Sequence, residues 1–206
     1  MLENYKIILW DFDGVIMDSM PIRSNGFRMV LKGYPESQVN ELMDFHRSNG
    51  GLSRYVKFRY FFEKIRNESI SDEEVQELAS SFSQIMLASL INRDLLIQDS
   101  VSFIESNWSK YEMHIVSGSD SKELNQICDD LDLSRFFKSI FGSPTPKIQL
   151  VESIIKHNNY SKNQIALIGD SINDYEAATT NGIDFIGYNN EDLMALHDKY
   201  ISRFAK

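Results

Sequence analysis

The chain has few of the residues that define several specialised classes of protein. It contains one cysteine, Cys128, so it cannot form a disulfide within the chain or a cysteine-based zinc cluster. This use of cysteine fits a reducing compartment, and we expect a cytoplasmic protein. The four histidines do not have the spacing typical of metal ligands.

Basic residues are outnumbered, with 21 Lys and Arg against 30 Asp and Glu and a net charge of -9. Nucleic acids and anionic membranes are bound through basic faces, so we expect neither as a partner, whereas a small anionic substrate needs only a local positive pocket. No apolar run is long enough to span a bilayer, and the first residues lack the pattern of a signal peptide. We expect a monomer or a weak dimer.

The 206 residues suffice for one domain with an inserted subdomain. Apolar patterning predicts strands that alternate with helices, which implies a parallel, Rossmann-like sheet with helices on both faces. The strands are expected at 5–10, 113–116, 139–141, 164–168 and 184–187. The helices are expected at 99–109 with Asp99 as its cap, and at 121–131, 147–157, 174–180 and 191–204.

The segment after the first strand has a different pattern. Helical spacing and a capping box at Ser71 predict helices at 21–31, 36–45, 52–65 and 71–91, and no strand. We therefore expect a core formed by 1–17 and 96–206, with a helical cap inserted at 18–95.

Two aspartates follow the first strand, where its apolar run ends. Asp11 and Asp13 are two residues apart, so on an extended chain their side chains point the same way. Two carboxylates this near to each other resist being ionised at the same time, unless a cation or a bound proton offsets the repulsion between their charges. Gly14 then allows a sharp turn. The alternative is an aspartate pair in a surface turn, but such a pair rarely follows a buried strand.

Two later strands also end in polar residues, Ser117-Gly118-Ser119 and Gly169-Asp170-Ser171. Ligands of parallel sheets bind beyond the carboxyl ends of the strands, so these residues are expected to meet Asp11 and Asp13. Asp11 can attack phosphorus, and Asp13 can move protons. With Asp170, three carboxylates around one point favour a hard cation such as Mg²⁺.

The other groups suit a phosphate. Ser117 offers a hydroxyl, the amides of Gly118 and Ser119 are expected to open a helix and cradle an anion, and Lys147 offers a positive charge. Each signal alone has a simpler interpretation: Ser117 and Asp170 can cap helices, and Lys147 can be a solvated helix residue. Their joint position at strand ends favours one site.

In this order the motifs resemble those of haloacid-dehalogenase-superfamily phosphatases. The resemblance rests on Asp11-Phe12-Asp13-Gly14, Ser117-Gly118, Lys147 and Gly169-Asp170-Ser171-Ile172-Asn173-Asp174. It covers 5–17 and the chain from about residue 96 onward. The inserted helices resemble the cap of the phosphoglycolate phosphatase and beta-phosphoglucomutase branch.

The resemblance implies a nucleophile, Asp11, and a general acid and base, Asp13. It implies that the phosphoryl group is held by Ser117, Gly118 and Lys147. It implies that Mg²⁺ is held by Asp11, the backbone carbonyl of Asp13 and Asp170. Asp174 would support the metal site as a further acid. Dehalogenases lack the second acid of the first motif, so Asp13 favours phosphoryl chemistry over carbon–halogen cleavage.

Substrate specificity is expected in the cap. The run from Asn49 to Arg54 resembles the specificity segment of this branch, including the Gly-x-Ser-Arg of sugar-phosphate mutases, here beginning at Gly51. Arg54 and Lys57 lie one turn apart and can reach a polar or anionic part of a substrate, although a solvated basic face is an equal alternative. Apolar spacing places three aromatic residues in the cap core: Tyr55, Phe58 and Phe62.

One departure bears on the activity. Arg23 occupies the position where the mutases carry a cap histidine used in proton transfer. We therefore expect a Mg²⁺-dependent phosphatase that acts on a small phosphomonoester, with sugar phosphates among the candidates. The alternatives are a sugar phosphomutase, a carbon–phosphorus hydrolase using a cap lysine (Lys32 or Lys57), and a non-catalytic phosphate-binding module.

Overall fold

The computed structural model describes residues 1–204, so 205 and 206 of the expected core lie outside it. The strands are β1 Ile7–Trp10, β2 Glu112–Asp120, β3 Ser139–Ser143, β4 Ile165–Gly169, β5 Asp184–Tyr188 and β6 Tyr200–Ile201. The helices are α1 Met20–Val30, α2 Glu36–Ser48, α3 Arg54–Tyr60, α4 Asp72–Leu90, α5 Gln98–Asn107, α6 Ser121–Asp130, α7 Lys147–Asn158 and α8 Ile172–Asn181.

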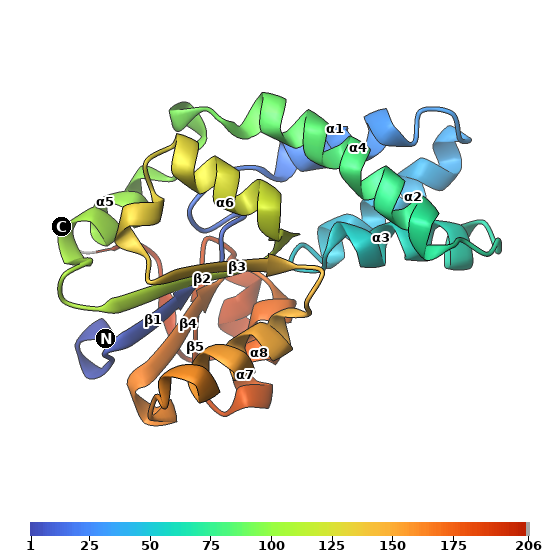
Figure 1. Ribbon diagram of the computed structural model, residues 1–206. Coiled ribbons are helices and arrows are strands. Elements are labelled where there is room, and N and C mark those ends of the chain that lie inside the picture. Colours follow the sequence, from blue (N-terminus) through green and yellow to red (C-terminus); the bar gives the residue numbers. More distant parts are fainter. Residues whose placement is uncertain (205–206) are drawn as a thin grey trace.

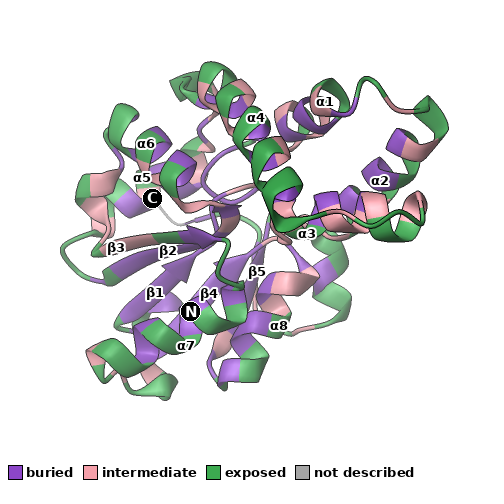
Figure 2. Ribbon diagram, turned by 45° about the vertical axis from the view of Figure 1, so that its right-hand side comes forward, coloured by how far each residue is buried: buried purple, intermediate pink, exposed green. Residues whose placement is uncertain are grey.

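The strands form one parallel sheet in the order β3-β2-β1-β4-β5-β6. Helices α5 and α6 cover one face, and α7 and α8 cover the other (Figure 1). Because side chains alternate along a strand, Ile8 and Trp10 of β1 pack on the side of α5 and α6, whereas Ile7 and Leu9 pack on the side of α7. The central strands β1 and β4 are buried on both faces (Figure 2), and the expected α/β architecture is confirmed.

Helices α1 to α4 lie together beside the sheet (Figure 1). The chain leaves and re-enters the sheet region through two adjacent segments, where Met17 pairs antiparallel with Leu96 and the Asp18 amide donates to the Leu95 carbonyl at 2.8 Å. The boundaries of the inserted cap, expected at 17/18 and 95/96, stay a prediction. No helix within 1–204 combines the length and apolar character that a membrane span needs.

The expected final helix at 191–204 is wrong. The segment contains a short 3-10 helix, Glu191–Ala195, and then β6, which pairs with β5 at the sheet edge. Asp99 explains part of this path. It lies inside α5 rather than capping it, and its Oδ2 accepts hydrogen bonds from the Tyr188 hydroxyl at 3.1 Å and the Phe204 amide at 3.0 Å.

The polar end of β2 also differs from expectation. β2 continues to Asp120, whose side chain caps α6 by accepting from the amides of Lys122 and Glu123 at 3.1 Å. The amides of Gly118 and Ser119 therefore lie in a strand and do not open a helix. In the cap, α3 is shorter than expected and passes into a π-helical turn, Phe61–Ile65. The capping box at Ser71 is present as expected.

Candidate active site

Three carboxylates meet at the carboxyl ends of neighbouring strands. Asp11 follows β1, Asp170 follows β4, and Asp174 lies in the first turn of α8. One oxygen from each lies within 4.8 Å of the others. Because β1 and β4 pair directly, residues about 160 positions apart in the chain are brought into one cluster.

One cation faces this cluster. Lys147, the first residue of α7, donates from Nζ to Asp11 Oδ1 at 2.8 Å and to Asp174 Oδ1. Burial opposes its charge, but Asp11 and Asp174 raise the pKa of Lys147 above its usual value. Burial and the charge of Asp174 raise the pKa of Asp11 to about 7. Burial and the charge of Asp11 raise the pKa of Asp170 well above its usual value.

The cluster fits a divalent cation. One lysine does not neutralise three carboxylates, of which Asp11 and Asp174 are buried and Asp170 is half-buried, and carboxylate oxygens are the ligands that Mg²⁺ prefers. Gly14 makes room for them, because at its φ of +80° a Cβ atom would overlap the Asp170 carboxylate. Asp174, expected as a further acid of the metal site, lies in one cluster with Asp11 and Asp170, and metal binding by the three stays a prediction. The backbone carbonyl of Asp13 stays a predicted ligand.

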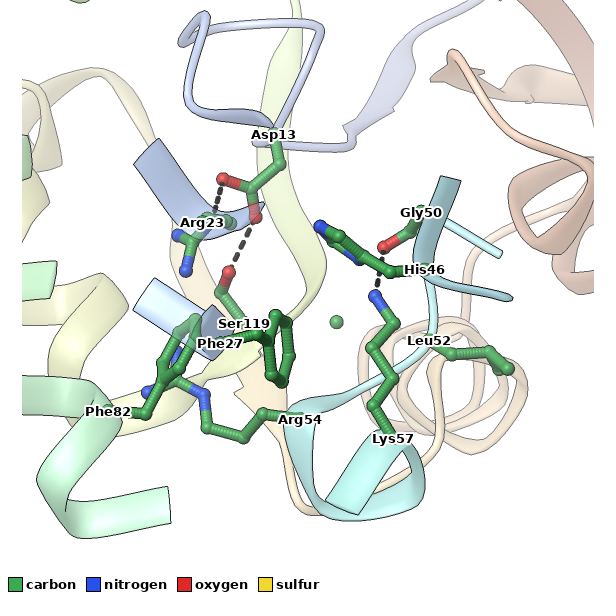
Figure 3. Close-up of a pocket in the computed structure, with 11 residues that line it drawn as sticks. Asp13, Arg23, Phe27, His46, Gly50, Leu52, Arg54, Lys57, Phe82 and Ser119 are labelled. Atoms are coloured by element: carbon green, nitrogen blue, oxygen red, sulfur yellow. Dashed lines mark hydrogen bonds and ion pairs between the residues drawn. The ribbon is translucent and has the colours of Figure 1, made fainter. Parts of the chain in front are cut away.

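The carboxylate of Asp13 points toward Arg23 and Ser119 at the cap (Figure 3). It accepts hydrogen bonds from Arg23 Nε at 2.5 Å, from Ser119 Oγ at 2.5 Å and from the Ser19 hydroxyl. Burial opposes its ionisation, but the charge of Arg23 and these hydrogen bonds hold the pKa of Asp13 below its usual value. The two aspartates of the first motif therefore have different surroundings and separate partners.

The expected phosphate-binding residues of β2 lie beside the cap. Ser117 is buried, and its hydroxyl accepts the Ser119 amide at 3.1 Å. Gly118 packs against the backbone carbonyl of Gly51, and a Cβ atom on Gly118 would overlap that oxygen. Gly51 therefore lies directly over the end of β2, and the cap is closed on the core at this point.

A small pocket lies between the cap and Asp13 (Figure 3), with a cavity volume of about 20 Å³. The cap residues expected to set specificity, Arg23, Arg54 and Lys57, all line it and are all buried. The alternative of a solvated basic face on α3 is therefore wrong. The three aromatic residues expected in the cap core differ in burial. Phe58 is fully buried there, whereas Tyr55 and Phe62 are only half-buried.

Glu123, on α6 of the core, holds two of these cap cations. Arg54 donates to both of its carboxylate oxygens, at 2.5 and 2.8 Å, and Arg23 donates to one at 3.1 Å. The sequence pattern missed Glu123, which near the start of a helix is typical of a capping residue. It also missed His46, which lines the pocket from α2, and Ser19, which donates to Asp13.

The family model for haloacid dehalogenase-like hydrolases matches residues 8–188. The chain belongs to this family. It is 21% identical over 188 residues to a phosphorylated carbohydrates phosphatase of Thermotoga maritima, covering 88% of this chain and 83% of the relative.

Two solved structures have the same fold. One is a predicted phosphoglycolate phosphatase from Haemophilus somnus, with a TM-score of 0.77, 20% identity and coverage of 98% of this chain and 96% of that one. The other is a beta-phosphoglucomutase from Clostridium difficile, with a TM-score of 0.75, 17% identity and coverage of 97% and 91%. The comparisons confirm the expected family and fold, and they support a phosphoric monoester hydrolase as the class of enzyme.

Proposed function

We propose that this chain is a Mg²⁺-dependent phosphatase that hydrolyses a small phosphorylated metabolite through an aspartyl-phosphate on Asp11. The observation that carries the proposal is the meeting of Asp11, Asp170, Asp174 and Lys147 at the strand ends, with Asp13 two residues from the nucleophile. The relatives are named as phosphatases of phosphorylated carbohydrates and of phosphoglycolate, which is consistent with a small substrate.

In the first step, a carboxylate oxygen of Asp11 attacks the phosphorus atom, and the bond from phosphorus to the ester oxygen breaks. The departing alkoxide takes a proton from the Asp13 carboxyl group and leaves as the alcohol. Lys147 places its positive charge next to Asp11, where charge on the phosphoryl oxygens must be offset.

In the second step, water attacks the phosphorus atom of the aspartyl-phosphate. Asp13, now a carboxylate, accepts a proton from that water, and the bond from phosphorus to the Asp11 oxygen breaks. Inorganic phosphate leaves and Asp11 regains its carboxylate. The hydrogen bonds from Ser119, Ser19 and Arg23 favour the carboxylate form of Asp13, which this step requires, and disfavour the acid form, which the first step requires.

Other groups position the substrate. When bound, Mg²⁺ supplies positive charge that offsets the carboxylates and the phosphoryl oxygens. Asp11, Asp170 and Asp174 would hold it, together with the Asp13 carbonyl. Ser117 and Gly118 lie at the end of the strand next to β1, where they would contact the phosphoryl group. The closed cap would exclude bulk water from the bond being broken.

Phosphate release from p-nitrophenyl phosphate and from a panel of small phosphorylated metabolites tests the proposal. We expect turnover with Mg²⁺ and its loss with a chelator. Asp11→Asn should lower the rate at least about 1,000-fold, because the attacking oxygen is lost. Asp192→Asn, a change at an exposed carboxylate outside the site, is the matched control and should leave the rate unchanged.

A sugar phosphomutase is the second candidate, because the run Gly51-Leu52-Ser53-Arg54 resembles that of the mutases. Isomerisation of a hexose 1-phosphate without net phosphate release would favour it. Absence of both reactions across the panel, or full activity in Asp11→Asn, would contradict the enzymatic proposal.

A further inference from the structure

Several buried polar atoms in the pocket beside Asp13 have no partner. Within residues 1–204, neither ring nitrogen of His46 is hydrogen-bonded, although the residue is 1% exposed. Arg23 Nη2 is likewise buried and without a partner in the described chain. Buried polar atoms are normally paired, and leaving one unpaired costs about 1–3 kcal/mol. These atoms all line the same pocket, which indicates a polar ligand there.

Lys57 adds a charge to the same pocket. It is 3% exposed, and its Nζ donates a hydrogen bond to the Gly50 carbonyl at 3.0 Å. Of the salt bridges within the described residues, none involves Lys57. A buried ammonium without a carboxylate is costly, so the site favours an anion brought by a ligand.

The arginines of the pocket are neutralised and Lys57 is not. Glu123 accepts both hydrogen bonds of the Arg54 fork and one from Arg23, and Asp13 accepts from Arg23 Nε. Two carboxylates thus face two guanidinium groups, and Lys57 leaves the pocket with one excess positive charge. Figure 3 shows its Nζ and the His46 ring on the side of the pocket opposite Arg54.

We propose that Lys57, His46 and the free Nη2 of Arg23 form a subsite for a second oxyanion of the substrate. The preferred substrate is then a phosphomonoester that also carries a carboxylate or a second phosphate. The pocket is small and has walls of Phe27, Leu52 and Phe82, which favours a short carbon skeleton. Arg54 is held by Glu123 and joins the cap to the core instead of binding this group. The inference rests on the proposed phosphatase function.

Matched substrate pairs test the subsite. The carboxylate is tested with 3-phosphoglycerate against glycerol 3-phosphate, and the second phosphate with fructose 1,6-bisphosphate against fructose 6-phosphate. In at least one pair we expect kcat/KM of the wild-type protein to be at least about 10-fold higher for the member with the extra anion. Equal rates within both pairs would overturn the proposal.

Substitution of Lys57 assigns the preference to a residue. Lys57→Met should lower kcat/KM for the doubly anionic member at least about 10-fold and change it less than about 3-fold for the singly anionic one. Lys57→Arg should recover part of the preference. Lys32→Met, at an exposed cap lysine, should leave both values unchanged. An equal fall for both members in Lys57→Met would indicate a structural role and overturn the assignment.

Direct binding separates this proposal from the phosphatase function. If the wild-type protein releases phosphate from none of the four compounds, it can be titrated with them by calorimetry without turnover. Tighter binding of the doubly anionic member, lost in Lys57→Met, would support the subsite although the phosphatase function had failed. Equal binding of both members would overturn the subsite.

Discussion

The two sides of Asp13 have opposite charge imbalances. On the core side, three carboxylates face Lys147. On the cap side, Arg23, Arg54 and Lys57 face two carboxylates, those of Asp13 and Glu123. The core has an excess of negative charge and the cap an excess of positive charge, so the proposed metal ion and anionic substrate would offset both. Because the cap is closed, these two regions of unbalanced charge lie on either side of Asp13.

Two buried lysines make the same contrast at the level of single residues. Lys147 lies between two carboxylates, which raise its pKa despite burial. Burial lowers the pKa of Lys57 to about 7, and although Asp13 opposes this, Arg23, Arg54 and Lys147 lower it further. The same side chain is a structural counter-ion in the core and an unpaired charge in the cap. The first therefore stabilises the protein and the second destabilises it.

Removing a carboxylate from the core side has the largest expected effect. Asp170→Asn leaves two carboxylates for the metal ion. We expect the Mg²⁺ concentration for half-maximal phosphate release to rise at least about 10-fold, with a loss of about 100-fold in rate at low Mg²⁺. A magnesium titration of activity measures both. Asp192→Asn is the control, and an unchanged magnesium requirement would exclude Asp170 from the metal site.

Removing a carboxylate from the cap side is expected to act on stability. Glu123→Gln leaves Arg54, and in part Arg23, buried without a counter-ion, and should cost about 3 kcal/mol in the free energy of unfolding. Urea denaturation measures this, with Glu77→Gln at an exposed glutamate as the control.

A double-mutant cycle measures the interaction energy between Glu123 and Arg54. Glu123→Gln combined with Arg54→Met should cost less than the sum of the single changes, because both charges of the bidentate pair are then removed. Additive losses would show that Glu123 and Arg54 do not stabilise each other across the cap and the core.

The core side could be predicted from the sequence because its information is local. A buried strand followed by Asp11 and Asp13, and another followed by Asp170, needs only a parallel topology to bring the groups together. The separation of the Asp13 carboxylate from the cluster of Asp11, Asp170 and Asp174 was not predictable. It depends on the turn at Gly14 and on the direction of the Asp13 side chain, which the cap sets through Arg23.

The cap side depends on contacts between distant segments. Glu123 resembles an ordinary residue in the first turn of a helix, and only the approach of the Arg23 and Arg54 side chains from the cap makes it the partner of two arginines. The helix predicted for the C-terminal segment was wrong for a related reason. Its apolar residues suit a helix, but the edge of β5 and the acceptor at Asp99 fix it as a strand and a loop.

The smallest expected effect sharpens the contrast between the two lysines. Lys57→Met removes an unpaired buried charge and should raise the free energy of unfolding near pH 7 by roughly 1–3 kcal/mol, which is about 2–12 °C in Tm for a chain of this size. A substitution that weakens binding of the doubly anionic substrate would thus stabilise the fold, as expected for a side chain retained for function. Lys147→Met should do the reverse, because Asp11 and Asp174 would lose their counter-ion.

The pH dependence of this gain has a defined sign. The pKa of Lys57 is about 7 in the folded protein and near its usual value of 10.5 when unfolded. Between these values the unfolded chain binds a proton that the folded chain does not, so the stability contributed by Lys57 rises with pH. The advantage of Lys57→Met should therefore be largest at pH 7 and below, and should shrink as the pH rises toward 10. Thermal unfolding of both proteins at pH 6.5, 8 and 9.5 measures the difference, and a gap that is independent of pH would show that Lys57 is not an unpaired cation in the folded protein.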